Sequence, residues 1–98
     1  VGAGGAVKAA GGMGAYAASK AAVATVTEAL ADELKDRDST VNAILPSTLY
    51  TPKNRLDMPQ ADFRRWVTPI EAAEVIAFLV SDEARAVTGA LIPVVGRV

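Results

Sequence analysis

The chain has 98 residues, 51% of them apolar, and its formal net charge at pH 7 is −1. This composition is typical of a globular core and supplies no basic patch for nucleic acid or an anionic membrane. The sequence shows neither a signal-peptide pattern nor an apolar run long enough to span a bilayer, so we expect a cytoplasmic location.

The residue types that are missing exclude several reaction classes. With no cysteine and no histidine, the chain cannot form disulfides, thiolate nucleophiles, histidine triads or the usual zinc sites. The acids Asp32, Glu33, Asp36 and Asp38 cluster around a predicted helix end, which is typical of a solvated surface. We therefore predict no metal site.

Residues 1–15 are rich in glycine and are predicted to form the end of a strand followed by a loop. The run that starts at Gly2 resembles a dinucleotide-binding fingerprint, but Val7 stands where that pattern requires its last glycine. No acidic residue follows at the ribose-binding distance, so the phosphate-binding half of a nucleotide-binding fold is predicted to be absent. The lack of an initiating methionine also indicates a piece of a longer protein.

The next predicted element is a long helix from Tyr16 to about Lys35. The opposite side of this helix carries small residues, which suit either close packing of another helix or solvent. At helical spacing, six residues fall on one face of this helix, and we expect that face to pack on the core. They are Tyr16, Lys20, Val23, Thr27, Leu30 and Leu34.

Tyr16 and Lys20 lie one turn apart on this helix and form the candidate catalytic pair. A phenol is a weak acid at neutral pH, but a nearby cation favours the phenolate and lowers the pKa of the phenol. Tyr16 is therefore a candidate general acid or base, with Lys20 as its electrostatic partner and as a donor to a bound hydroxyl group. The alternative is a chance spacing, in which Tyr16 covers the core and Lys20 extends to water.

The middle of the chain predicts a strand, a loop and a second helix. Residues 41–45 form a short apolar run ended by Pro46, as expected of a strand buried in a parallel sheet. A loop is predicted from there to Val67. The segment Thr68–Glu71 places a hydroxyl at the N-cap, proline at the first helical position and glutamate three residues after the cap, so a helix should follow to about Val80.

The last segment predicts a charged turn at residues 81–85, a tight turn at 88–89 and a final strand at 90–95. Pro93 cannot donate to a strand ladder, so this strand should lie at a sheet edge or contain a bulge. The order strand, helix, strand, helix, strand predicts a parallel sheet with right-handed crossovers.

These segments resemble the C-terminal half of the short-chain dehydrogenase/reductase family over essentially the whole chain. The family's Tyr-x-x-x-Lys motif is matched by Tyr16 and Lys20, and its Val-Asn-x-x-x-Pro-Gly strand end by Val41–Ser47. Residues 78–90 are similar to the family's closing helix, turn and strand. The resemblance implies an α/β fold, in which residues 1–98 form the C-terminal catalytic half of one Rossmann-type domain. That domain is a doubly wound parallel sheet in three layers, α/β/α, and its N-terminal dinucleotide-binding half would be absent here.

The resemblance also implies NAD or NADP as the cofactor and a small-molecule substrate with a C=O or C=N group. Tyr16 would protonate the substrate as hydride arrives, and Lys20 would assist the phenol and hold the nicotinamide ribose. Four further residues would border the nicotinamide, namely Pro46, Ser47, Leu49 and Thr51.

Two positions depart from the family pattern: Ala3 stands at the place of the usual catalytic serine, and Ser47 replaces a glycine. Residues 48–66 closely resemble the substrate loop of dihydropteridine reductase, a branch that also lacks the serine. Its substrate, a quinonoid dihydropterin, is a conjugated imine whose reduction creates no alkoxide, so a hydroxyl at position 3 is less necessary. The substrate-loop residues would be Asn54, Met58, Phe63 and Trp66; the alternative is a packed loop that Phe63 and Trp66 anchor.

A second class of function stays open beside the enzyme. Without a cradle for the cofactor, these 98 residues are expected to be inactive alone. A truncated fragment would then act only as a packing or oligomerisation module. As part of a full-length protein, the chain is expected to belong to a homo-oligomer.

Overall fold

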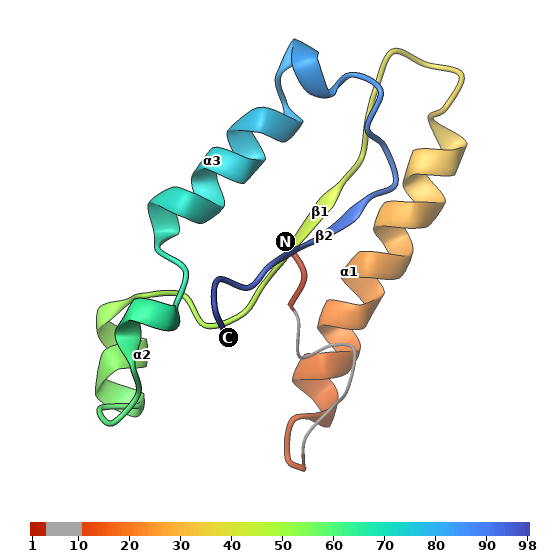
Figure 1. Ribbon diagram of the computed structural model, residues 1–98. Helices are drawn as coiled ribbons and strands as arrows, with labels where there is room; N and C mark the ends of the chain where they lie inside the picture. Colours follow the sequence, from red (N-terminus) through yellow and green to blue (C-terminus); the bar gives the residue numbers. More distant parts are fainter. Residues whose placement is uncertain (4–10) are drawn as a thin grey trace.

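The computed structural model describes residues 1–3 and 11–98. Figure 1 shows two short strands between the two longest helices, so the described residues form three layers. Of the segment 1–15, predicted as the end of a strand followed by a loop, residues 4–10 with Val7 lie outside the described residues. The elements in chain order are α1 (Gly14–Glu33), β1 (Ala43–Pro46), α2 (Pro52–Asp57), the 3-10 helix η2 (Phe63–Arg65), α3 (Pro69–Leu79), the 3-10 helix η3 (Asp82–Ala84) and β2 (Leu91–Val94).

The two strands pair in parallel, with Ala43 opposite Leu91 and Pro46 opposite Val94. The predicted parallel sheet is confirmed. Within the described part of the chain, β2 has β1 as its one neighbour, which places the exposed Pro93 on an edge strand as expected.

The strand β1 begins two residues later than predicted, because Asn42 bonds through its side chain. The amide nitrogen of Asn42 donates to the carbonyl of Val87 at 2.9 Å, and its amide oxygen accepts from the backbone N–H of Ala90 at 3.0 Å. These two bonds hold the chain segments before the strands together, and the regular ladder starts only after them.

The first residues of the chain lie on the other side of β1. The backbone N–H of Gly2 donates to the carbonyl of Ile44 at 2.8 Å. A side chain at position 2 would collide with Leu45, so glycine is what allows this close approach. Ala3 is thereby placed beside the carboxyl end of β1, where its position matters for the site.

The packing face of α1 differs from the prediction. Tyr16 is 50% exposed and Leu30 is 38% exposed, whereas the buried residues are Ala17, Thr27 and Ala31. The predicted face was therefore wrong at two of its large side chains and right at Thr27. Alanines set the buried face because their small side chains let the helix backbone approach the strands.

The core cluster lies on the α3 side of the sheet. Ile44, Val67, Ala72 and Leu79 are buried together, and five partly buried apolar side chains pack against them. Because side chains alternate along a strand, Ile44 faces α3 while its neighbours in β1 face the opposite layer. The core thus anchors β1 at its centre and α3 along its length.

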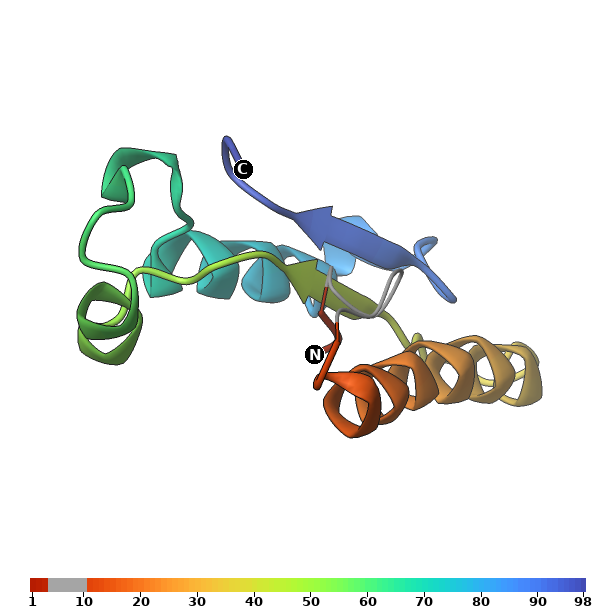
Figure 2. The same cartoon turned by 90° about the horizontal axis from the view of Figure 1, so that it is seen from below.

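The segment predicted as one loop up to Val67 contains two helical turns. The helix α2 starts as α3 does: Thr51 is its N-cap, its hydroxyl accepts from the backbone N–H of Asn54, and proline follows the cap. Figure 2 shows α2 and the chain after it projecting beyond the end of the sheet, away from α1. The prediction of an uninterrupted loop was wrong here.

The helix α3 confirms its predicted start and ends one residue before the predicted end. Thr68 accepts a hydrogen bond from the backbone N–H of Glu71 at 3.1 Å, and the Glu71 carboxylate accepts from the Thr68 backbone N–H at 2.9 Å. This reciprocal pair is a capping box, and it satisfies two amides that the helix leaves without partners.

The described chain is elongated, with extents of 48 × 29 × 18 Å and a radius of gyration of 14.9 Å. A compact domain of this length has a radius of gyration of about 13 Å. Few large side chains are therefore well buried: Ile70 and Phe78 of α3, and Val80 at its C-cap, are at least half exposed. No helix in the described ranges is both long and apolar enough to cross a membrane.

Loss of the α3 cap should lower stability. We expect Thr68→Ala to reduce the free energy of unfolding by about 1 kcal/mol, because the amide of Glu71 loses its acceptor. Urea denaturation followed by circular dichroism measures this change. Thr25→Ala is the matched control, since that exposed hydroxyl bonds only within α1, to Ala21. Equal midpoints for Thr68→Ala and the control would contradict a stabilising cap.

The same cap predicts a dependence of stability on pH. The hydrogen bond from the Thr68 backbone N–H, followed by that from its hydroxyl, lowers the pKa of Glu71 below the ordinary value of 4.5. A lowered folded-state pKa stabilises the fold above the unfolded value, and this contribution is lost as the pH falls through the lowered value. We expect Glu71→Gln to weaken the loss of stability below pH 4.5, measured by urea midpoints across that range. An unchanged acid profile would contradict this role.

Candidate active site at the carboxyl end of β1

A cavity of about 490 Å³ opens at the carboxyl end of β1. The end of the strand, the first turns of α1 and the start of α2 all contribute to it. Ligands of open parallel sheets bind at this edge, because strand ends and loops converge there. The described residues that line it are Val1, Gly2, Ala3, Tyr16, Lys20, Pro46, Ser47, Thr48, Leu49, Thr51 and Asn54.

The structure brings Tyr16 and Lys20 to this cavity together. They lie one turn apart in α1, and the Nζ atom of Lys20 is 5.8 Å from the centre of the Tyr16 ring. Tyr16 is half exposed and so is accessible to a ligand. Among the described lining residues, Lys20 carries the one charged side chain, so the cavity favours a negative or electron-rich group near the phenol.

Hydrogen bonds hold the loop after β1 in place. The Ser47 hydroxyl donates to the carbonyl of Val95 at 2.9 Å, which ties the end of β1 to the end of β2. Farther along, the backbone N–H of Tyr50 donates to the carbonyl of Val67 at 2.7 Å. The backbone N–H of Val67 donates in turn to the carbonyl of Thr48 at 3.2 Å. Hydrogen bonds therefore hold this wall of the cavity both at Ser47 and at Thr48 and Tyr50.

Thr51 and Asn54 complete the wall at the start of α2. Besides capping the helix through Thr51, this pair fixes the loop, because the side-chain amide of Asn54 donates to the carbonyl of Leu49 at 2.8 Å. Both side chains are partly buried and border the cavity. These bonds hold the backbone between Leu49 and Thr51 in the wall of the Tyr16 cavity.

Position 3 also lines the cavity, on the same side as Gly2. A serine there would present a hydroxyl to the space that Tyr16 borders, but this chain has a methyl group instead. The cavity therefore offers one fewer hydrogen-bond donor to a bound oxygen atom. The family pattern drew attention to Ala3, because the usual serine stands at this distance before the tyrosine. It did not predict that Val1 and Gly2 also line the cavity, because neither side chain has a reactive or hydrogen-bonding group.

The predicted substrate-loop residues separate in the structure. Asn54 lines the cavity beside Tyr16, whereas Phe63 and Trp66 line a second cavity beyond the bonded loop. Met58 follows α2, is 40% exposed and lines neither cavity. The four residues therefore do not border one common cavity, and Asn54 is the one that borders the Tyr16 cavity.

Acidic groups are few around the Tyr16 cavity. Nearby in sequence, Asp62 bonds to Arg64: the side chain and backbone N–H of Arg64 both donate to it and lower the pKa of the Asp62 carboxyl. This pair is exposed and lies outside the lining of the Tyr16 cavity.

In residues 1–3 and 11–98, no three acidic side chains approach one another closely enough to hold a metal ion.

Comparison with known proteins agrees with this geometry. Residues 1–96 match the family model described as Enoyl-(Acyl carrier protein) reductase. The chain is 42% identical over 87 residues to the protein FixR of Bradyrhizobium diazoefficiens, an alignment that covers 84% of this chain and 31% of FixR. The chain thus spans about a third of the length of the curated relatives it matches.

Two crystal structures share its fold. The 3-ketoacyl-(acyl-carrier-protein) reductase of Brucella melitensis, complexed with NADH, superposes with a TM-score of 0.81 at 34% identity, over 98% of this chain and 41% of the reductase. An oxidoreductase of the short chain dehydrogenase/reductase family from Burkholderia thailandensis gives a TM-score of 0.83 at 34% identity, over 97% and 41% of the two chains. Together with the match over residues 1–96, these likenesses show that the chain belongs to the short-chain dehydrogenase/reductase family.

Proposed function

We propose that this chain is the C-terminal catalytic half of an NAD(P)H-dependent reductase that acts on a small molecule with a C=O or C=N group. The observation that carries the proposal is the cavity at the end of β1, where Tyr16 and Lys20 meet on adjacent turns of α1. The family supports a reductase, and the Brucella relative was crystallised with NADH. The share of each relative that the chain covers supports a larger domain, whose other half would hold the dinucleotide phosphates.

The residues of the cavity fit the nicotinamide end of such a cofactor. Pro46 and Leu49 offer apolar contacts to a flat ring, while Ser47 and Thr51 stand at the same wall with hydroxyl groups. When bound, the reduced nicotinamide supplies hydride to the substrate. Lys20 would hold the ribose hydroxyls by hydrogen bonds and keep positive charge close to the phenol.

Tyr16 is the proton donor in this proposal. Its ring lines the cavity and is half exposed, so the phenolic hydroxyl can meet the atom of the substrate that gains negative character. Lys20 stabilises the phenolate that remains after proton transfer, because its ammonium carries the positive charge next to the ring. In this proposal Tyr16 transfers the proton, and Lys20 stabilises the negative charge that remains on Tyr16.

The proton-donor role predicts a selective loss of turnover. In the full-length enzyme, Tyr16→Phe should lower kcat by about 10² to 10⁴-fold and leave cofactor affinity nearly unchanged. Lys20→Ala should lower kcat and also weaken cofactor binding, because the ammonium serves both phenol and ribose. Steady-state kinetics with isothermal titration of the cofactor separate the two effects.

The control for Tyr16→Phe is Ser19→Ala, which removes an exposed hydroxyl from the same helical turn. That hydroxyl bonds to the backbone carbonyl of Tyr16 and does not line the cavity, so activity should stay close to that of the parent enzyme. Near-normal turnover by Tyr16→Phe would overturn the proposed proton donor.

A finer candidate within this function is reduction of a conjugated imine such as a quinonoid dihydropterin. The observation that favours it is Ala3, which borders the cavity where the family's usual serine would assist a developing alkoxide. Protonation of an imine nitrogen needs no such hydroxyl. The resemblance of residues 48–66 to the dihydropteridine reductase loop supports the same substrate.

A substrate panel tests this candidate. The full-length enzyme should show a higher kcat/KM for a quinonoid dihydropterin than for 3-ketoacyl thioesters, simple ketones or aldehydes. Ala3→Ser should raise activity on ketones relative to the pterin, since the added hydroxyl stabilises an alkoxide; Ala18→Ser, at an exposed position of α1, is the control. A clear preference of the parent enzyme for a ketoacyl substrate would exclude the pterin and leave the general reductase.

We also propose that the full-length enzyme is a homo-oligomer. The exposed surface of α3 carries the large apolar side chains Ile70, Ile76 and Phe78 beside Glu71 and Glu74, and Val80 is exposed at its C-cap. Large apolar side chains that gather on a surface often mark a contact with another protein chain. The alternative of a purely structural module draws on this same surface, but it leaves the Tyr16 and Lys20 arrangement without a role.

A further inference from the structure

A second cavity, of about 500 Å³, lies on the other side of the bonded loop from the Tyr16 cavity. The predicted substrate-loop aromatics Phe63 and Trp66 border it, together with Tyr50. The ring centroids of Phe63 and Trp66 lie 4.8 Å apart. The Tyr50 ring is edge-on to both, with its centroid 6.0 Å from that of Phe63 and 6.5 Å from that of Trp66. Tyr50 and Phe63 are partly exposed, so they offer ring surface to a ligand, whereas Trp66 is buried behind them.

Arginines gather around the same cavity. Three of the six arginines in the sequence line it, namely Arg64, Arg65 and Arg97. A fourth, Arg55, stacks on the Tyr50 ring with its guanidinium 5.1 Å from the ring centre. Because the whole chain has a net charge of −1, this local excess of positive charge is a distinct feature of one corner.

Acidic residues neutralise only part of this charge. Asp62 forms a two-point ion pair with Arg64, with nitrogen–oxygen distances of 2.9 and 3.0 Å. Glu71 also lines the cavity, and its carboxylate already accepts two hydrogen bonds from Thr68. Arg65 and Arg97 form no ion pair among the described residues, although Arg97 is close enough to Glu71 to help lower the pKa of its carboxyl.

One of these arginines is fixed in place. The Nε and Nη2 atoms of Arg65 donate to the carbonyl of Arg97 at 3.0 and 2.8 Å, and the backbone N–H of Arg97 donates to the carbonyl of Arg65 at 2.9 Å. Gly96 permits this approach: its φ is +62°, and a side chain there would come within 2.7 Å of the Arg65 carbonyl oxygen. Arg97 also lines the cavity, and its guanidinium makes one long hydrogen bond, from Nη1 to the carbonyl of Gly96 at 3.5 Å.

From this juxtaposition we propose that the second cavity binds a small planar anion, an aromatic ring that carries a carboxylate or phosphate group. The ring packs against Tyr50 and Phe63, which the buried Trp66 supports from behind, and the oxyanion accepts hydrogen bonds from Arg65 and Arg97. Arginine suits this role, because its flat fork of donors matches a carboxylate or phosphate. The site lies apart from Tyr16 and Lys20, so it does not depend on the proposed reductase activity.

The test is titration of the full-length protein with phenyl phosphate and with benzoate, followed by calorimetry and by the fluorescence of Trp66. Inorganic phosphate and benzyl alcohol serve as probes of the oxyanion alone and of the ring alone. We expect at least one of the two aromatic anions to bind more tightly than both partial probes, and to bind more weakly at high salt. Comparison of phenyl phosphate with benzoate identifies the preferred oxyanion.

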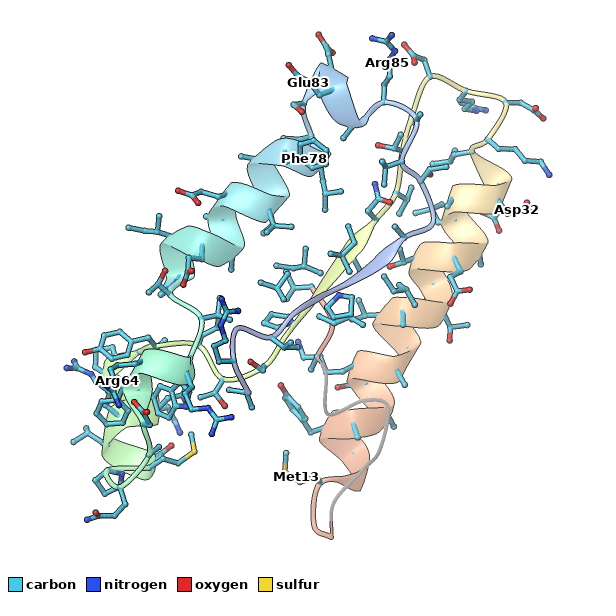
Figure 3. The ribbon with its side chains drawn as sticks, viewed as in Figure 1. Met13, Asp32, Arg64, Phe78, Glu83 and Arg85 are labelled. Carbon is cyan, nitrogen blue, oxygen red and sulfur yellow. The ribbon has the colours of Figure 1, made fainter. Side chains whose placement is uncertain are left out.

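Arg97→Gln should weaken binding of the aromatic anion about tenfold, because it removes charge-assisted hydrogen bonds while the backbone bonds to Arg65 remain. Arg97→Lys should recover part of the affinity. The matched control is Arg85→Gln: Figure 3 shows Arg85 and Arg64 at opposite ends of the molecule. Phe63→Leu should also weaken binding, since it removes ring contact but keeps an apolar side chain.

Two results would overturn the proposal. The first is failure of both aromatic anions to bind, or binding of benzyl alcohol as tight as theirs. The second is an equal loss of affinity for the aromatic anion in Arg97→Gln and Arg85→Gln, in variants whose circular dichroism matches that of the parent protein. Such a result would show that only the net charge of the protein matters, and not an arginine in the cavity.

Discussion

The parallel pairing of β1 with β2 is the constraint on which the rest of the structure depends. Parallel strands end at the same edge, so Ser47 meets Val95 there and the loop after β1 starts from a fixed point. The layer of α1 on one side brings Tyr16 to that edge, and the buried cluster around Ile44 holds α3 on the other. Without this register, neither cavity would have a defined wall.

Local signals in the sequence predicted α3 almost to the residue, because Thr68, Pro69 and Glu71 act within one helical turn. The same kind of signal stands at Thr51 and Pro52, yet the helix α2 was not predicted. Its six residues carry no apolar periodicity, and such a short helix depends on its cap more than on burial. A capping threonine followed by proline marks the start of both helices, but only that of α3 also has the glutamate of a capping box.

Features that depend on the fold were harder to predict. The face of α1 turned out to be set by Ala17 and Ala31, since an alanine-rich helix has too little contrast between its sides to show which one is buried. The residues at the strand end were found because family motifs keep them close in sequence. Arg65 and Arg97 lie 32 residues apart and meet only through the turn at Gly96, so no local pattern indicated their shared cavity.

The loop between Ser47 and Thr51 has one further consequence. Leu49 borders the Tyr16 cavity, and the next residue, Tyr50, borders the arginine cavity. A single peptide segment, bonded to Val67 on both sides of Leu49, is therefore a common wall between two binding spaces. Because the two spaces share this wall, a displacement of the segment on one side changes the shape of the space on the other.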